Sequence, residues 1–129
     1  MPIAAESSAH IGHGAIIHGA TIGRNCLVGM NAVIMDHVTI GDESIVGALS
    51  LIKERENIPP RTLIAGNPAR IIREVSDEMI GWKTEGTTLY QQLPHQLGSG
   101  WLPCEPRRSG KPSDIPEIPV GYQSWGDSN

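Results

Sequence analysis

A six-residue repeat in the first half of the chain constrains its fold more than any other feature of the sequence. Five consecutive blocks of six residues each begin with Ile or Val, and the second residue is Gly in four of the five. The blocks cover residues 22–27, 28–33, 34–39, 40–45 and 46–51. A short period sustained over five blocks indicates a solenoid in which each coil packs on its neighbours.

The period also predicts the geometry of the coil. Six residues of extended chain cover about 20 Å, so a turn after every block gives a prism with three sides and three blocks per coil. Successive coils then stack as parallel strands about 4.8 Å apart. This places Ile22 next to Ile40, and Val28 next to Val46, in ladders inside the prism. Gly at the second position predicts a corner that either needs unusual backbone angles or has no room for a side chain.

The repeat changes register once, near its start. Ile11-Gly12 resembles the start of a block but lies 11 residues before Ile22, so one corner between them must be shortened. The irregular segment 11–21 contains His13 and His18. We expect the coils to begin at about Ile11. A repeat that breaks its own rule beside polar residues is a reasonable place to expect a functional site.

The rest of the chain divides into three regions. We predict an all-β solenoid, a parallel β-helix, over residues 1–74, an α-helix within 75–95 and an irregular or partly disordered tail over 96–129. Ser76 is a suitable helix N-cap, and Pro94 is expected to end the helix. The candidate packing residues of the helix are Met79, Trp82, Leu89, Tyr90 and Leu93. The tail shows no helical or strand period, although a strap across a neighbouring subunit is an alternative.

Charge and composition exclude several classes of protein. The net charge is −4 and no basic stripe is present, so we do not expect a nucleic acid partner. The two cysteines, Cys26 and Cys104, make no disulfide framework, which is typical of reduced thiols in a cytosolic protein. The sequence shows neither a signal peptide nor a run of about 18 apolar residues, so we expect a cytoplasmic protein without a membrane partner.

His13 and His18 are the candidate metal ligands, and their spacing restricts how they could act. On a straight strand, five residues span about 16 Å and place the two side chains on opposite faces. A zinc ion needs each ligand nitrogen within about 2.1 Å, so this pair could not share one ion. The pair could serve two ions, each lying between this chain and a neighbouring copy. On spacing alone, ordinary surface or hydrogen-bonded histidines are the commoner explanation.

The sequence around these histidines resembles the γ-carbonic anhydrase family of hexapeptide-repeat proteins. The resemblance rests on Gly12-His13-Gly14-Ala15-Ile16-Ile17-His18-Gly19 and on residues 22–36, which follow it. Similar segments recur at 40–48, 66–70 and 82–91, so the resemblance extends over about residues 10–93. Within the family, the chain is similar to the branch that contains the phenylacetic acid degradation protein PaaY and the carnitine operon protein CaiE.

The resemblance implies a homotrimer of left-handed β-helices, each with a C-terminal helix along its side. It also implies zinc, or another divalent metal, at each subunit interface, held by three histidines, with His13 and His18 bound to different ions. His10 would lie beside the ligands or on the surface, and His37 on the surface. Asn31 lies in a Gly-Met-Asn corner, where we expect it to cap the turn rather than reach the metal. Catalytic residues and an organic cofactor site are not assigned.

One departure from the family pattern bears on function. The third ligand of the family lies about one coil upstream of His13, but only 12 residues precede His13 here. We therefore expect the chain to correspond to the C-terminal two thirds of such a protein, with impaired activity. The expected function is metal-dependent attack on carbon dioxide or a coenzyme A thioester, in phenylacetate or carnitine-type metabolism. The alternatives are a hexapeptide-repeat acyltransferase with His as general base and a non-catalytic trimeric accessory protein.

Overall fold

The computed structural model describes residues 2–101, 103, 105 and 106. Residues up to Thr87 form one compact unit, and a second unit begins at Thr88, inside helix α1 (Asp77–Gly100). The strands and the first part of the helix belong to the first unit. Cys104 and most of the predicted tail lie outside the described residues.

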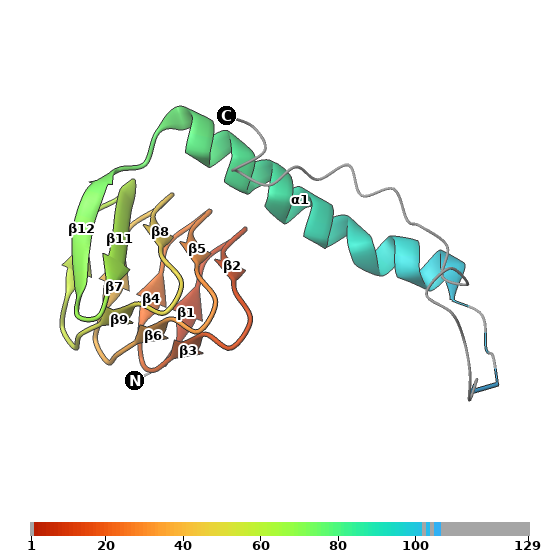
Figure 1. Cartoon of the computed structure of the whole chain (residues 1–129), viewed down its shortest axis with the longest axis horizontal. Coiled ribbons are helices and arrows are strands. Elements are labelled where there is room, and N and C mark those ends of the chain that lie inside the picture. The colour runs from red at the N-terminus through yellow and green to blue at the C-terminus, as the bar shows by residue number, and fades with distance from the viewer. Residues whose placement is uncertain (1, 102, 104, 107–129) are drawn as a thin grey trace. The chain divides into compact units, whose positions relative to one another are not determined.

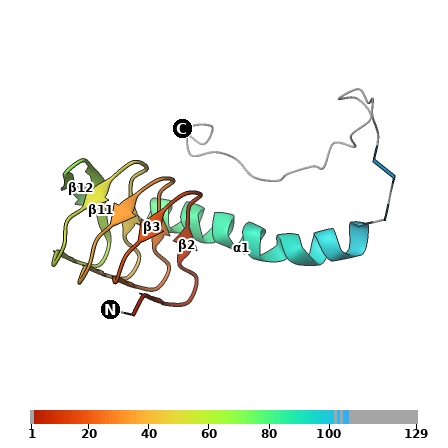
Figure 2. The same cartoon turned by 90° about the horizontal axis from the view of Figure 1, so that it is seen from below.

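The strands β1 to β11 wind into a parallel β-helix, and β12 follows as an antiparallel neighbour of β11 (Figures 1 and 2). The first coil consists of β1 (Ala4–Ala5), β2 (His10–Ile11) and β3 (Ile16–Ile17). The second consists of β4 (Thr21–Ile22), β5 (Leu27–Val28) and β6 (Val33–Ile34), and the third of β7 (Thr39–Ile40), β8 (Ile45–Val46) and β9 (Leu51–Ile52). The chain continues through β10 (Asn57–Ile58), β11 (Thr62–Gly66) and β12 (Ala69–Glu74).

These strands stack into three sheets that form the sides of a prism. Sheet A contains β1, β4, β7 and β10; sheet B contains β2, β5, β8, β11 and β12; and sheet C contains β3, β6 and β9. Ile22 pairs with Ile40, and Val28 pairs with Val46. This is the register that the repeat predicts, and the predicted parallel β-solenoid is confirmed.

The coils begin earlier than the sequence pattern indicates. Strand β1 pairs with β4, so Ala5 occupies the position that Ile22 holds one coil later. The expected start at about Ile11 is therefore wrong by one side of the prism. The physical reason is that alanine is small enough for the inner position but does not show the Ile/Val pattern by which the later blocks are recognised.

Two positions of each block build the core. The first residue of the block is buried in every case, and so is the fifth. The first positions are Ile22, Val28, Ile34, Ile40, Val46 and Ile52, and the fifth positions are Cys26, Ala32, Val38, Ser44 and Ser50. Full burial of each Ile or Val contributes about 1.5–3 kcal/mol relative to exposure. The stacked ladders therefore account for much of the stability of this short solenoid.

The glycines at the second position are required because a side chain has no room there. A Cβ atom on Gly29 would lie 2.4 Å from the backbone nitrogen of Ala48, in the next coil. Gly29 does not have a positive φ; positive φ occurs instead on the fourth residue of each block, for example 52° at Asn25 and 56° at Asn31. Of the two explanations offered for these glycines, lack of room is confirmed and unusual backbone angles are wrong.

The shortened corner lies between β3 and β4. The step from Ile16 to Thr21, which begin these strands, is five residues, whereas the strands from β4 to β10 begin six residues apart. Gly19 occupies the fourth position of its block, which has a positive φ, here 69°. Ala20 occupies the fifth position, which is buried. One residue is therefore missing before Gly19, and His18 alone fills two positions of the corner.

Helix α1 begins as predicted but ends later. The Ser76 hydroxyl accepts a hydrogen bond from the Met79 backbone N–H at 3.2 Å, which confirms the N-cap. Pro94 lies inside the helix, which continues to Gly100. The predicted end at Pro94 is wrong, and residues 96–100 are helical rather than part of the tail. Pro94 is exposed, so water can replace the donor that the ring removes.

The side chains that the helix buries differ from those predicted. Lys83 and Thr87 are its buried residues. Met79 and Trp82 are half-buried, and so are Leu89 and Leu93. Tyr90 is 53% exposed. Within the described residues, no helix is long and apolar enough to cross a membrane.

The first turns of the helix lie along the corner between sheets A and B. Arg61 donates to the carboxylate of Asp77 at 2.5 Å, and Asn25 donates to the hydroxyl of Thr84 at 3.0 Å. Arg61 and Asn25 lie two coils apart, about 10 Å, which equals the rise of about seven helical residues. The helix therefore runs along this corner against the direction in which the coils progress.

Candidate functional site

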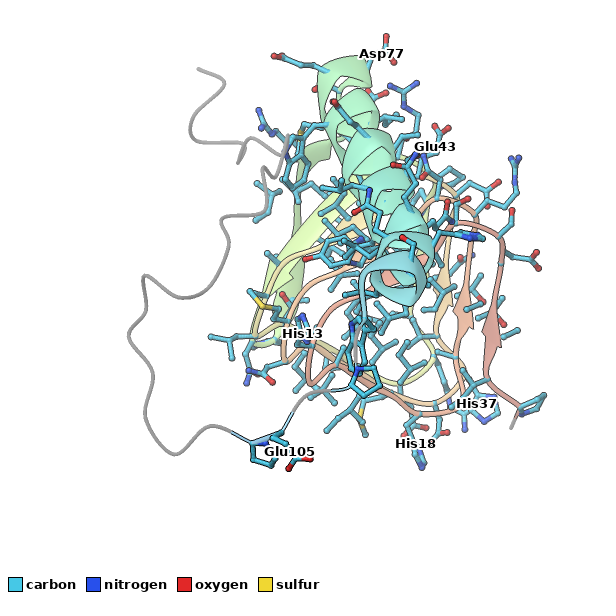
Figure 3. All side chains as sticks on the ribbon, turned by 90° about the vertical axis from the view of Figure 1, so that its right-hand side faces the viewer. His13, His18, His37, Glu43, Asp77 and Glu105 are labelled. Carbon is cyan, nitrogen blue, oxygen red and sulfur yellow. The ribbon has the colours of Figure 1, made fainter. Side chains whose placement is uncertain are left out.

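The structure places the two candidate ligands at different corners of the first coil. His13 lies in the corner between β2 and β3, and His18 lies in the shortened corner between β3 and β4. Both side chains are exposed, and Figure 3 shows them apart from one another. One chain does not bring the two histidines together, as expected from their spacing.

A carboxylate holds the ring of His18. Nδ1 of His18 donates to Oδ2 of Asp36 at 2.9 Å, and the two side chains are 72% and 35% exposed. Asp36 lies one coil further along the same corner. A carboxylate on one ring nitrogen is the arrangement that orients metal-binding histidines, because it leaves the other nitrogen, here Nε2, available to a ligand. We did not predict this pair, although the separation of 18 residues, one coil, could have indicated it.

The corner that carries His13 packs against Asn31 of the second coil. The backbone N–H of Asn31 donates to the carbonyl of His13 at 2.9 Å. The side-chain oxygen of Asn31 occupies the space that a Cβ atom on Gly14 would need. Gly14 itself has φ of 70°. Asn31 therefore packs over the turn, as predicted, and Gly14 is needed both for its backbone angle and for the room it leaves.

The other two histidines of the first two coils have different surroundings. His10 is half-buried on β2, and its pKa is lowered by burial first and then by the nearby Lys83 and His13. His37 is exposed, as predicted, and takes the positive-φ place of its corner with φ of 59°. His10 is therefore biased toward the neutral form, and His37 meets a backbone requirement of the corner.

The described residues do not by themselves assemble a complete metal site. Within residues 2–101 and the few described beyond them, no group of three His, Cys, Asp or Glu side chains could hold a metal ion. His18, oriented by Asp36 and exposed, fits the role of one ligand, and exposed His13 fits the role of another. A complete donor set would need side chains from outside these described residues.

An apolar surface lies between the two histidines. Its centre is sheet C, where Ile16 is 56% exposed and Leu51 is half-buried. Along the corner that carries His13, one and two coils further on, Met30 is 56% exposed and Leu49 is 71% exposed. We call these four residues the sheet C surface. Exposed apolar side chains that gather on one part of the surface are suited to contact with a protein partner.

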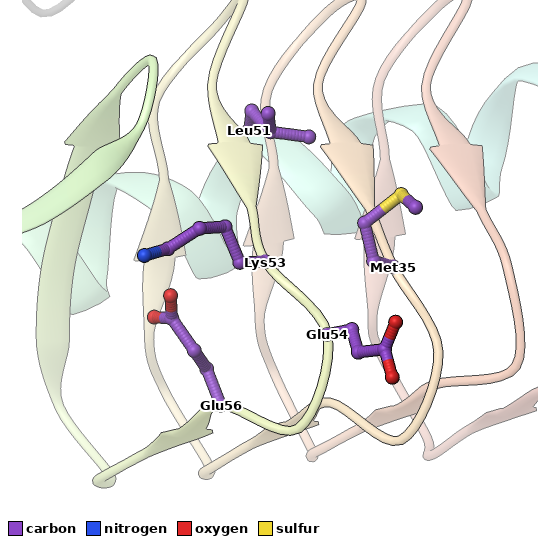
Figure 4. Close-up of a pocket in the computed structure, with 5 residues that line it drawn as sticks. All are labelled: Met35, Leu51, Lys53, Glu54 and Glu56. Carbon is purple, nitrogen blue, oxygen red and sulfur yellow. The ribbon is translucent and has the colours of Figure 1, made fainter.

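A depression of about 500 Å³ lies at the other edge of this surface (Figure 4). Its lining combines apolar and charged side chains: Met35, Leu51, Lys53, Glu54 and Glu56. Glu54 follows Asp36 by one coil, so the depression adjoins the corner that carries the His18–Asp36 pair. The depression is wide open to solvent, and its lining offers both a cation and carboxylates.

Comparison with known proteins identifies relatives that share this repeat. The family described as bacterial transferase hexapeptide (six repeats) matches residues 19–54. The carnitine operon protein CaiE of Salmonella agona is 46% identical over 101 residues, which make up 78% of this chain and 51% of that protein. CaiE of Escherichia coli K12 is 55% identical over 84 residues, 65% of this chain and 43% of that protein. The chain spans about half the length of the curated relatives it matches.

Solved structures have the same fold. A crystal structure of a putative acetyltransferase from Bacillus cereus superposes with a TM-score of 0.69 and 34% identity, covering 71% of this chain and 54% of that one. The N-acyltransferase AntD from Bacillus cereus, bound to dTDP and 3-hydroxybutyryl-CoA, gives a TM-score of 0.55 at 18% identity, covering 69% and 60% of the two chains. The second likeness shows the fold alone.

Proposed function

Since this chain belongs to the hexapeptide-repeat family, we propose that it is a γ-carbonic anhydrase-like protein that binds metal ions between the subunits of a homotrimer. The observation that carries the proposal is the His18–Asp36 pair, in which a carboxylate orients an exposed imidazole. The identity of 46–55% to CaiE proteins supports it.

The trimer is proposed from the sheet C surface and the two corners beside it. A surface contact that repeats around a three-fold axis closes a ring, and it joins one edge of each subunit to a different edge of the next. His13 and His18 lie at the two corners that flank sheet C. Packing of this surface in a ring would bring His13 of one copy toward His18 of the next copy. Each interface would then receive one histidine of each kind.

The chemistry proposed for this interface is hydrolytic or hydrating. A bound zinc ion with an open coordination position supplies hydroxide near neutral pH. In the chain itself, His13 and His18 would bind the metal, and Asp36 would hold the His18 ring in the orientation that presents Nε2. The proposed substrate is carbon dioxide or a coenzyme A thioester. The name of the CaiE relatives supports a place in carnitine-type metabolism rather than phenylacetate degradation.

Metal analysis of single variants tests the ligand assignment. We expect His13→Ala and His18→Ala to reduce bound zinc to a similar degree, because each interface needs one of each. Asp36→Asn should weaken zinc affinity by about 10- to 100-fold, the usual effect of removing a carboxylate that orients a ligand. His37→Asn is the matched control, because His37 is exposed and asparagine tolerates the positive φ of this position, so bound zinc should be unchanged. Full zinc occupancy in either the His13 or the His18 variant would show that the residue is not a ligand.

The oligomeric state is tested separately. Sedimentation at micromolar concentration should give a trimer, and Leu49→Glu, which places a charge on the sheet C surface, should shift it toward the monomer. A wild-type monomer would refute the interface site, whereas a trimer without zinc would refute only the metal function.

An acyltransferase is the second candidate. It is favoured by the 34% identity to the Bacillus cereus protein described as a putative acetyltransferase. Such an enzyme would use a histidine as general base and bind coenzyme A without any need for metal. Acetyl transfer that persists in the presence of a chelator would support this candidate over the metal-dependent one.

A further inference from the structure

A buried lysine lies outside the proposed metal site. Lys83 of helix α1 is 3% exposed. Its ammonium group donates to the carbonyl oxygen of Ser8 at 2.5 Å and to Oδ1 of Asn25 at 2.7 Å. Among the ion pairs of the described residues, none includes Lys83. A buried charge held only by neutral oxygen atoms is unusual, because lysine is almost never fully buried without an ionic partner.

The two oxygen atoms belong to successive corners of the solenoid. Ser8 and Asn25 take the positive-φ place in the first and second coils, with φ of 60° and 52°. The corners are joined by a hydrogen bond from the Asn25 backbone N–H to the carbonyl of Ser7 at 3.1 Å. The side-chain amide of Asn25 donates to the hydroxyl of Thr84, which leaves its oxygen for Lys83. The socket is therefore shaped to accept an ammonium group.

The surroundings of this socket disfavour the charged form of Lys83. Burial lowers the pKa of Lys83 to about 8, although the nearby Cys26 acts in the opposite direction. His10 also faces this region, and its pKa is lowered in part by the charge of Lys83. A methionine of similar length would avoid this cost. Replacement of buried charged groups by apolar ones is often neutral or stabilising, so stability alone does not account for the lysine.

The first coil buries less side-chain surface than the later coils do. Its inner positions are only partly covered, in contrast to the fully buried Ile and Val ladders of later coils; they are Ala5, Ala9, Ile11, Ala15 and Ile17. Ile11 and Ile16 remain 40% and 56% exposed. Backbone hydrogen bonds to the second coil, such as His10 N–H to the carbonyl of Cys26 at 2.8 Å, supply most of the remaining attachment.

We propose that Lys83 is a latch that couples docking of helix α1 to the order of the first coil, residues 4–18. With the Lys83 amino group in its socket, where it donates hydrogen bonds in the charged or the neutral form, the corner at Ser8 is fixed to both the helix and the second coil. Without this contact, the first coil loses its packing on the second coil, while the later coils stay folded. The coil that opens carries His13 and His18, so the latch governs the order of that surface whatever those residues bind.

Hydrogen exchange of the full chain tests the latch. Lys83→Met should increase amide exchange in residues 4–18 by about tenfold or more, while exchange in residues 39–52 changes little, because opening is local. Lys53→Met is the matched control, since Lys53 is exposed in the third coil, and it should leave the first coil unchanged. Unchanged exchange of the first coil in the Lys83 variant, or an equal increase in every coil, would overturn the proposal.

Two further measurements keep the proposal testable if Lys83→Met does not fold. Propylammonium, which matches the atoms that Lys83→Ala removes beyond Cβ, should slow exchange of the first coil in that variant. Tetramethylammonium cannot donate a hydrogen bond and should have no effect. In the wild-type background, Asn25→Asp adds a carboxylate to the socket and should slow exchange of residues 4–18. Failure of the amine to protect the first coil, or faster exchange in the Asn25 variant, would refute the latch.

Discussion

Replacing Gly29 with alanine should destabilise the chain by about 3 kcal/mol. The added Cβ atom would lie 2.4 Å from the backbone nitrogen of Ala48 and 2.6 Å from the carbonyl carbon of Gly47. Carbon atoms in good contact lie about 3.5–4.0 Å apart, so the two coils would have to separate locally by about 1 Å. Both neighbours are backbone atoms, and no flexible side chain can move away to relieve the contact.

The magnitude follows from what this separation disrupts. The backbone N–H of Gly29 donates to the carbonyl of Val46 at 2.8 Å, and that of Leu49 donates to the carbonyl of Met30 at 2.9 Å. A shift of about 1 Å would weaken or break these bonds, each worth about 1 kcal/mol net. Overpacking of a tight interior adds about 1–3 kcal/mol. With the two bonds weakened rather than lost, these effects together give the expected loss of about 3 kcal/mol.

Urea unfolding followed by circular dichroism measures this loss. Gly81→Ala is the matched control, because Gly81 lies in helix α1 and a Cβ atom there would meet nothing within 4 Å. That control should stabilise the helix by about 0.5–1 kcal/mol. If Gly29→Ala lowers the free energy of unfolding by less than about 0.5 kcal/mol, the reasoning is refuted, because small backbone movements would then be enough to relieve the contact.

Three further predictions follow from the core and from the helix. Ile34→Ala should lower the free energy of unfolding by about 2–5 kcal/mol, because this fully buried side chain stacks between Ile17 and Ile52, and urea unfolding checks it. For Lys83, the folded pKa of about 8 lies below the ordinary value of 10.5, so the unfolded chain binds the extra proton between these values. Its contribution to stability should therefore rise with pH through that window, by about 3 kcal/mol at most, and unfolding titrations of Lys83→Met should lack this rise. Pro94→Ala should restore a backbone donor inside helix α1 and increase the helical far-UV circular dichroism signal.

The parts of the fold that repeat were predictable because their cause is local. The period of six, the Ile and Val ladders and the shortened corner before Ile22 all follow from positions that recur along the chain. Each coil packs on its neighbours in the same way, so the pattern within one block predicts which residues of the next block are buried. The pattern failed to predict strand β1, because at Ala5 a small residue occupies the position where the repeat has Ile or Val.

The end of the helix was not predictable in the same way. Pro94 usually stops a helix, and a local rule was the only guide available from the sequence. The structure continues the helix through an exposed position, where the missing backbone donor faces solvent and is tolerated. Solvent exposure is a property of the folded chain rather than of the residue.

For the candidate site, the sequence by itself determined that His13 and His18 could not share one ion within one chain, since their spacing along an extended strand holds them too far apart. Only the tertiary structure decided what surrounds them. The carboxylate of Asp36 reaches the His18 ring across a coil boundary, and Lys83 reaches Ser8 over 75 residues of sequence. Such contacts depend on the stacking distance of the coils and on the path of helix α1 along one corner. Hydrogen bonds form only within about 3.2 Å, a condition that residue order alone does not specify.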